Sequence, residues 1–242
     1  MPIDSSIPWR RPIGSKEAKI RIDENFHKHR FLYHMLRWSY AREAIDRMSL
    51  RFSPVKCWSD PFERWWCEQI YSGAEGLSGT NAYGFCCTIG SRDEPRWRMA
   101  AAGHSDPIVR IRISPSLLLE APWAESFGAG RLFVGDVRYR SERDLREMAN
   151  RFREMPPKPV SRKAADLLLH KRRAFSFERE VRVLWLDKQH EKNELWIPLR
   201  AGHITQVMIS PYVDQQTASE IKRYISEKQI PVLQSQILAH PR

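Results

Sequence analysis

Glycine is scarce in this chain, with 11 among 242 residues, and the glycines form neither of the two common phosphate-binding motifs. The absence of GxGxxG excludes a Rossmann dinucleotide loop, and the absence of GxxxxGKS or GxxxxGKT excludes a P-loop. The zinc-protease motif HExxH and the hydrolase motif GxSxG are missing as well. The sequence therefore contains none of these nucleotide-binding or hydrolytic motifs.

Cysteine is scarcer still, with four residues at positions 57, 67, 86 and 87. Their number and spacing do not match the disulfide framework of a small secreted protein, which favours a reducing compartment. A zinc site would need two CxxC-like pairs, which the sequence lacks, and the adjacent Cys86 and Cys87 would face opposite ways on a strand. We therefore expect buried free thiols and no bound metal.

Long apolar runs are also missing, because no stretch approaches the roughly 18 to 20 consecutive apolar residues of a membrane-spanning helix. The N-terminus carries Asp4, Arg10 and Arg11 and lacks the apolar segment of a secretory leader. We expect a cytoplasmic protein that has no membrane partner.

Basic residues are abundant, with 40 Lys and Arg against 29 Asp and Glu and a net charge of +11. Such a balance favours a polyanionic partner. Charge alone does not choose between nucleic acid, a dinucleotide, an acidic protein and an anionic membrane surface. A generally solvated basic face is the alternative interpretation.

The order of the expected elements predicts an α+β fold, because short strands and helices follow one another without a regular βαβ alternation. Residues 1–28 are polar and aperiodic and are expected to form a partly ordered N-terminal arm, whereas residues 29–242 are expected to form a single domain. Helices are expected near residues 40–48, 61–70, 95–102, 142–152, 161–171 and 214–228. Strands are expected near residues 31–34, 50–53, 83–89, 108–113, 132–139, 177–186, 195–198, 204–209 and 231–238.

Two carboxylates stand close together in the segment 177–186, which otherwise reads as an apolar strand. The period of two predicts that Glu178 and Glu180 share one face, about 6.5 to 7 Å apart along the strand. Like charges at that separation resist joint ionisation, so the pair must be solvated, clamped by a cation or partly protonated. The alternative is a solvated strand edge at which the two residues pair with nearby arginines.

An ordered set of residues resembles the ADP-ribosyltransferase fold: Tyr33 and His34 on the first strand, Thr88 at the end of a middle strand, and the late Glu178 and Glu180. In that fold, a His or Arg on the first strand, a Ser or Thr region on a middle strand and a late catalytic Glu converge on a cleft for NAD. The resemblance implies a split mixed sheet flanked by helices.

A second resemblance covers nearly all of residues 31–238. The runs LYH at 32–34, SDPFE at 59–63, CCT at 86–88, RW at 96–97 and FEREVR at 177–182 look like the bacterial family called domain of unknown function 2971. The chain departs from the pattern of that family at Ser59, Arg96 and Ala100. The family has no settled activity, and its members look like distant relatives of ADP-ribosyltransferases in toxin or phage-defence settings.

The chemistry implied by these resemblances is the transfer of ADP-ribose from NAD, which is a substrate here. Loss of neutral nicotinamide needs no general acid, and the developing oxocarbenium cation is best stabilised by a carboxylate. By resemblance, Glu180 would bind a ribose hydroxyl and stabilise the cation. Glu178 would orient or deprotonate the acceptor, which would be a nucleic acid or a protein.

Further roles follow from the same resemblance. His34 and Thr88 would position NAD, Tyr33 would stack on the nicotinamide ring, and Trp97 lies in the segment that would face the cofactor. Lys171, Arg172 and Arg173 would neutralise a pyrophosphate or a nucleic-acid acceptor, unless they form only a solvated helix end. An antitoxin is a possible further partner.

Three functions remain open on the sequence. The first is an NAD-dependent ADP-ribosyltransferase that acts as a toxin or phage-defence effector. The second is a catalytically silent relative that binds nucleic acid or protein through a basic, Trp-rich surface. The third is an RNA-cleaving toxin that uses His34 or His170 together with Glu180 as acid and base.

Overall fold

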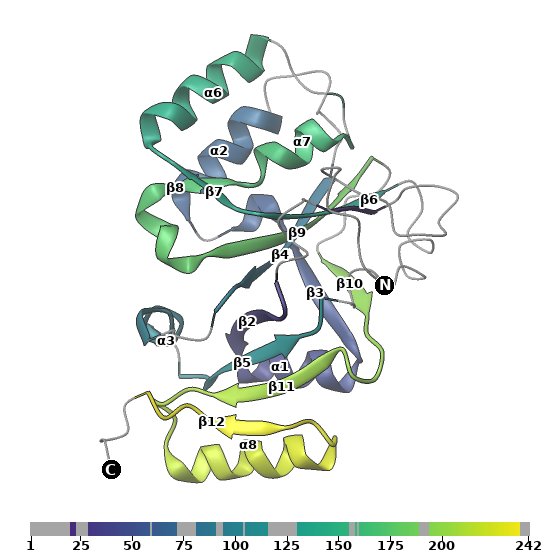
Figure 1. The fold of residues 1–242 in the computed structure, drawn as a ribbon, viewed down its shortest axis with the longest axis vertical. Helices are drawn as coiled ribbons and strands as arrows, with labels where there is room; N and C mark the ends of the chain where they lie inside the picture. Colours follow the sequence, from purple (N-terminus) through teal and green to yellow (C-terminus); the bar gives the residue numbers. More distant parts are fainter. Residues whose placement is uncertain are drawn as a thin grey trace. The chain divides into compact units, whose positions relative to one another are not determined.

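The structure is a computed structural model, which describes residues 20–22, 29–58, 60–71, 81–90, 94–103, 105–115, 130–154, 158, 160–188 and 194–237 (Figure 1). The chain divides into two compact units. Unit 1 comprises residues 1–29, 51–86 and 119–197, and unit 2 comprises residues 30–50, 87–118 and 198–242. The predicted arm lies outside the described residues except for 20–22. The assignment of residues 29–242 to a single domain stays a prediction.

Unit 1 is built on strands that pair in the order β1-β6-β9-β4. The strand β1 (Ile20–Ile22) is parallel to β6 (Arg131–Asp136), which is antiparallel to β9 (Glu180–Asp187). Its helices are α2 (Pro61–Tyr71), α6 (Glu142–Glu154) and α7 (Arg162–Leu167). Its remaining elements include the parallel pair β7 (Arg138–Arg140) and β8 (His170–Arg172), the 3-10 helices η2 (Val55–Cys57) and η3 (Arg173–Glu178), and β10 (Leu195–Pro198).

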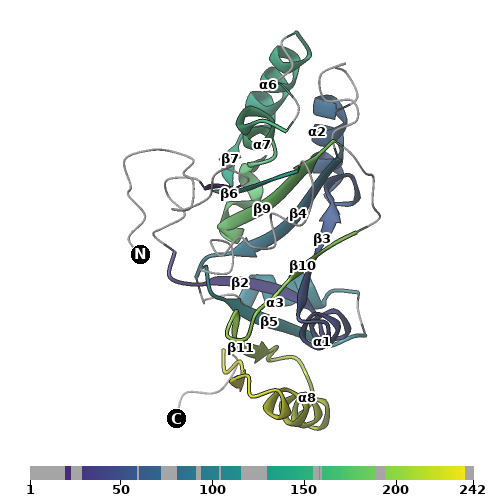
Figure 2. The same ribbon diagram turned by 90° about the vertical axis from the view of Figure 1, so that its right-hand side faces the viewer.

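Two strands run through both units, namely β3 (Ser49–Pro54) and β4 (Asn81–Thr88). Unit 2 pairs its strands in the order β2-β5-β11-β12. The strand β5 (Ile108–Ile113) is antiparallel to β2 (Leu32–Arg37) and to β11 (Ile204–Ile209), whereas β12 (Val232–Gln234) is parallel to β11. Its helices are α1 (Trp38–Asp46), α3 (Glu94–Ala101) and α8 (Gln215–Glu227), the last of which lies against β12 (Figure 2). Mixed strand pairing with flanking helices confirms the α+β fold class.

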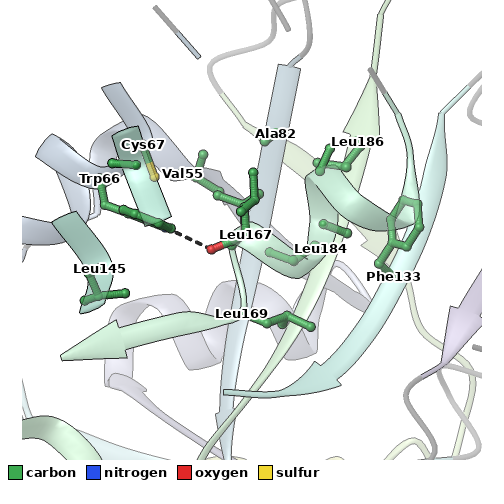
Figure 3. Close-up of a cluster of buried hydrophobic side chains, with 14 residues drawn as sticks. Val55, Trp66, Cys67, Ala82, Phe133, Leu145, Leu167, Leu169, Leu184 and Leu186 are labelled. Atoms are coloured by element: carbon green, nitrogen blue, oxygen red, sulfur yellow. Dashed lines mark hydrogen bonds between the residues drawn. The ribbon is translucent and has the colours of Figure 1, made fainter. Parts of the chain in front are cut away.

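The core of unit 1 packs one face of β9 against helices (Figure 3). Leu184 and Leu186 are two residues apart and therefore point to the same side, where α7 contributes a row of small and apolar side chains. From α2, Trp66 enters this core and donates its indole N–H to the carbonyl of Leu167 at 2.8 Å. The neighbouring Trp65 is only partly buried and packs at the border of this core.

Two helix starts are stabilised by an aspartate. Asp60 accepts the backbone N–H of Phe62 at 2.9 Å, and Pro61 occupies the first turn of α2, where no N–H is needed. Asp214 accepts the backbone N–H of Thr217 at 2.9 Å and caps α8.

Two helix predictions were wrong in their boundaries. The first helix begins at Trp38, not near residue 40, so Ser39 lies in its first turn, where its hydroxyl donates to Asp106 at 2.5 Å. The helix expected over residues 161–171 ends at Leu167, and His170–Arg172 forms a strand instead. The reason is tertiary: β7 offers this segment a parallel partner, with Arg138 opposite His170. The interpretation of residues 170–173 as a helix end is therefore wrong.

No helix among the described residues is long and apolar enough to span a bilayer.

Candidate active site

A buried group of charged side chains lies at the start of β9 in unit 1. It consists of the carboxylates of Glu63, Glu178 and Glu180 and the cations of Lys171 and Arg182, which we call the carboxylate cluster. The members come from α2, η3, β8 and β9, so four elements of one unit meet here. Each side chain except that of Glu178 is at most 10 % exposed, so their charges must be matched inside the protein.

The backbone between the two predicted glutamates is not a strand. Glu178 ends the 3-10 helix η3, Arg179 has a left-handed conformation with φ 46°, and β9 begins only at Glu180. The expectation that both carboxylates follow the period of two on one strand was therefore wrong. They approach each other through a shared cation instead, because the bend at Arg179 turns Glu178 toward Lys171.

Arg182 holds Glu180 in a fork. Because they are two residues apart on β9, their side chains share a face. The Arg182 Nε donates to Oε1 of Glu180 at 2.8 Å, and Nη2 donates to Oε2 at 3.1 Å. Arg182 also donates to a carboxylate oxygen of Glu63 and to the carbonyl of Leu168, the latter at 2.7 Å. Five donor positions in a planar guanidinium suit this arrangement, and a lysine could not reproduce it.

Lys171 lies among the three carboxylates. Its Nζ is 2.6 Å from Oε2 of Glu178, 3.2 Å from Oε2 of Glu180 and 3.6 Å from Oε2 of Glu63. The shortest contact is to Glu178, whose side chain is the most exposed of the three carboxylates at 18 %. Lys171 therefore links the buried Glu180 to the edge of the cluster.

The electrostatics of the cluster separate the two predicted glutamates. Burial opposes ionisation of Glu180, but the positive charges and hydrogen bonds of Arg182 and Lys171 outweigh it and lower its pKa to about 2. Burial raises the pKa of Glu178 above its usual value, and Lys171 offsets this only in part. The three carboxylate charges also overcome the effect of burial on Lys171 and raise its pKa. Glu180 is thus a fixed anion, and Glu178 is the carboxylate closer to protonation.

Three further side chains enclose the cluster. The phenol oxygen of Tyr139 accepts the backbone N–H of Glu180 at 2.8 Å, and burial raises the pKa of Tyr139 to about 12. Cys86 forms a side-chain hydrogen bond with Glu180. The indole of Trp58 lies 4.2 Å from the guanidinium carbon of Arg182. Stacking on an aromatic ring stabilises a guanidinium that has been removed from water.

The position of Trp58 depends on a glycine in β4. A Cβ atom added at Gly84 would lie 2.6 Å from Cζ2 of Trp58, closer than real side chains approach. The absence of a side chain at Gly84 therefore lets the indole cover Arg182.

The predicted phosphate-binding residues differ in what they already contact. Lys171 is enclosed by the cluster, and Arg172 pairs with Asp60 at 2.9 Å and with Glu142 at 3.2 Å. Arg173, in contrast, is exposed at the start of η3. Arg173 is thus the most exposed of the three. Their contact with a phosphate or nucleic acid stays a prediction.

The residues predicted to bind NAD lie in unit 2. Thr88 is paired with Tyr33, and its hydroxyl is 3.4 Å from the carbonyl oxygen of Tyr33. Tyr33 and His34 are adjacent on β2 and therefore point to opposite faces of the sheet. Trp97 is 1 % exposed in α3. The structure thus groups Tyr33 with Thr88 and separates both from the His34 side chain, while the predicted meeting of His34 with Glu180 stays a prediction.

Sequence reasoning did not place Glu63 or Tyr139 beside the two glutamates. Glu63 was noted as part of the run SDPFE, and Tyr139 lay at the end of an expected strand. The spacing of Arg182 from Glu180 did contain a signal, because residues i and i+2 of a strand share a face. Nothing in the sequence indicated that Glu63, more than a hundred residues earlier, would contact the same guanidinium.

His170, considered above as a possible acid or base, is 6 % exposed and its Nδ1 lies 2.8 Å from the carbonyl oxygen of Asp166. Burial, together with Arg138, lowers the pKa of His170 to about 4. The imidazole is therefore neutral near pH 7 and cannot readily donate a proton as a general acid. Among the described residues, no group of three or more His, Cys, Asp or Glu side chains could hold a metal ion.

Comparison with solved structures found similarity to a DarT from Thermus sp. 2.9. Its complex with NAD+ aligns with a TM-score of 0.38 and 8 % identity over 86 % of this chain and 96 % of that one. Its complex with carba-NAD+ gives a TM-score of 0.36, 10 % identity and coverage of 85 % and 94 %. Its complex with ADP-ribosylated single-stranded DNA gives a TM-score of 0.36 and 10 % identity over 86 % of this chain and 95 % of that one.

No protein-family model matches the chain, and no curated protein matches it. The resemblance to the domain of unknown function 2971 is therefore not confirmed.

Proposed function

We propose that this protein is an NAD-dependent ADP-ribosyltransferase in which Glu180 stabilises the cationic ribose of the transition state. One observation carries the proposal: the Glu180 carboxylate is kept ionised and fixed in place by Arg182 and Lys171, despite being 5 % exposed. A preorganised anion of this kind suits a reaction whose transition state gains positive charge.

The electrostatic requirement of the reaction is simple. Cleavage of the bond between ribose and nicotinamide releases a neutral leaving group and develops an oxocarbenium cation. A carboxylate that stays ionised at all physiological pH values can stabilise that cation without first losing a proton. Because the pKa of Glu180 is about 2, it meets this condition.

A ribose hydroxyl would need an acceptor position on Glu180. Arg182 occupies one position on each oxygen, Lys171 contacts Oε2, and Cys86 supplies a further contact. The thiol is a weak donor, so a hydroxyl group could replace it at small cost. Lys171 lies closer to Glu178 than to Glu180, so it could also shift toward Glu178 as a substrate binds.

Glu178 has a separate role in this proposal. Its raised pKa brings it nearer to neutral pH than Glu180, and its side chain is more exposed. These properties suit a group that accepts a proton from the nucleophile of an acceptor. The acceptor is a nucleic acid or a protein, and a toxin or phage-defence setting is the context that we propose.

The alternative is a catalytically silent module of the same fold that binds nucleic acid or protein. It is favoured by one observation, namely that Glu180 is 5 % exposed and that both of its carboxylate oxygens already bind Arg182 or Lys171. In that case the cluster would only stabilise unit 1, and the basic residues would carry the function.

The deciding experiment incubates the purified protein with labelled NAD and a cell extract and asks whether label enters protein or nucleic acid. Glu180→Gln keeps the volume of the side chain but removes its charge, and we expect it to abolish NAD turnover. Glu178→Gln should allow NAD cleavage to water while slowing transfer to the acceptor. Undiminished turnover in Glu180→Gln would remove the proposal.

A matched control is Glu147→Gln, which makes the same chemical change on the exposed face of α6. It should leave turnover unchanged. If wild type and control show no turnover with any extract, while the fold is intact by circular dichroism, the silent module is the correct reading.

A further inference from the structure

The strands β2 and β5 of unit 2 present two unlike faces. Residues at one set of alternating positions, such as Leu32 and Ile111, are 0 % exposed and form the apolar core. The opposite set contains Phe31, Tyr33 and Arg112, which are all half-buried, so this face is accessible in part. It carries aromatic rings interleaved with guanidinium groups.

The outer pair on this face is Arg112 with Phe31. The guanidinium carbon of Arg112 lies 4.4 Å from the centre of the Phe31 ring. Its Nε donates to the hydroxyl of Thr205 at 2.8 Å, and its Nη2 lies 3.4 Å from the Thr205 carbonyl oxygen. Among the described residues, these partners are neutral, so the positive charge of Arg112 is oriented but not balanced by a carboxylate. Arg30 also lies 5.4 Å from the same ring.

The inner pair is Arg110 with Tyr33. The guanidinium carbon of Arg110 lies 4.6 Å from the centre of the Tyr33 ring and 5.8 Å from that of Trp97 in α3. Its Nη2 is 3.1 Å from the sulfur of Met208. Arg110 is 3 % exposed, so it lies beneath the face and supports the Tyr33 ring without contacting a ligand directly. Two positive charges and two rings thus alternate along neighbouring strands.

From this arrangement we infer that the face formed by Phe31, Tyr33 and Arg112 is a binding site for single-stranded nucleic acid. The rings provide platforms on which bases stack, and Arg112 provides a phosphate contact from a side chain already held by Thr205. Phe31 and Tyr33 are two residues apart, roughly 6.8 Å along an extended chain, so that successive bases can each meet a ring.

Single strands fit this face better than the other anions. The bases of a duplex are stacked on one another and present only their edges in the grooves, so the rings of a sheet face cannot reach them. An acidic protein would use the positive charge of Arg112 but would leave the rings without planar partners. The combination of ring and guanidinium is typical of sequence-tolerant binding to single strands.

This inference names a site for a nucleic-acid acceptor and in that respect rests on the proposed function. Its test measures binding in the absence of NAD. Loss of the proposed transfer activity in Glu180→Gln would leave such binding intact, and loss of binding in Phe31→Leu or Arg112→Met would leave NAD cleavage to water intact. The two failures are therefore distinguishable.

The experiment measures fluorescence anisotropy of labelled single strands of about 15 nucleotides, both DNA and RNA, against the full chain. Phe31→Leu and Tyr33→Leu remove a ring each, and we expect either to weaken binding about tenfold. Phe31→Trp keeps a stacking surface and should restore it. Arg112→Met should lower the slope of log affinity against log salt concentration by about 0.7, the value for one phosphate contact on a single strand.

The matched control is Arg143→Met, which removes one positive charge from a side chain that is 86 % exposed on α6. It should change neither affinity nor salt slope. Circular dichroism and thermal unfolding must show that every variant is folded. Equal weakening by Arg112→Met and Arg143→Met, unchanged affinity in both ring variants, or equally tight binding of a duplex would each overturn the inference.

Discussion

The two units bury a guanidinium group in different surroundings. In unit 1, Arg182 is 1 % exposed and is held by the carboxylates of Glu180 and Glu63. In unit 2, Arg110 is 3 % exposed and lies against the rings of Tyr33 and Trp97 and the sulfur of Met208. Both solutions remove a cation from water.

The two surroundings differ in charge and in how strongly they bind a guanidinium group. Carboxylates bind a guanidinium strongly but add negative charges that must themselves be desolvated, and they can be neutralised by protons. Aromatic rings bind a guanidinium more weakly, add no negative charge and do not titrate near neutral pH. Arg182 is therefore held mainly by charge, whereas Arg110 has aromatic rings among its neighbours, and substitutions can test whether the two surroundings differ in strength.

The largest expected effect comes from removing the centre of the carboxylate cluster. Arg182→Met should destabilise the protein by about 3–5 kcal/mol, because Glu180 and Glu63 would be left buried without their main cation. Urea unfolding followed by tryptophan fluorescence measures the change. A loss below about 1 kcal/mol would show that the cluster is not the buried ion network described here.

Acid should act on unit 1 through Glu180. Its pKa of about 2 in the folded protein is lower than its usual 4.5, so its stabilising contribution is present above pH 4.5 and is lost as the pH falls toward 2. The size is on the order of 3 kcal/mol. Unfolding free energies of wild type and Glu180→Gln between pH 6 and pH 2 should converge at the acid end. Arg112→Met should keep the pH dependence of the unfolding free energy of wild type. A loss of that pH dependence in Arg112→Met, as expected for Glu180→Gln, would contradict the comparison.

A smaller effect is expected at the glycine that makes room for Trp58. Gly84→Ala places a methyl group where the indole lies and should cost about 1–3 kcal/mol by overpacking. Trp58→Leu combined with Gly84→Ala should cost less than the sum of the two single changes, since the clash is removed. Additive free energies of unfolding would argue against the contact.

The smallest effect is expected in unit 2. Arg110→Met keeps apolar contact with the neighbouring rings and removes a buried charge, so it should destabilise by about 2 kcal/mol or less. The unfolding free energies of Arg110→Met and Arg182→Met, measured side by side, compare the two surroundings directly. A loss as large as that of Arg182→Met would show that ring faces and carboxylates support a buried guanidinium equally well.

The sequence predicted the elements better than their contacts. Strand 108–113 was found with its bounds, and the helix expected near residues 214–228 lies at Gln215–Glu227, since apolar alternation and capping are local signals. The helix at residues 161–171 was overextended, because the pairing of His170 with Arg138 is not visible locally. Two close carboxylates at Glu178 and Glu180 were visible in the sequence, but the cation between them, Lys171, comes from another strand.

The left-handed residue between the two glutamates has a consequence for comparing this protein with others. Glu180 is fixed by the register of its strand, in which Val181 stands opposite Asp136, whereas Glu178 belongs to the preceding 3-10 turn. A homologue with a longer or shorter turn can therefore keep the carboxylate equivalent to Glu180 in place and still lose the one equivalent to Glu178. Alignments of this segment should be anchored at Glu180, and gaps should be placed on the N-terminal side of Arg179.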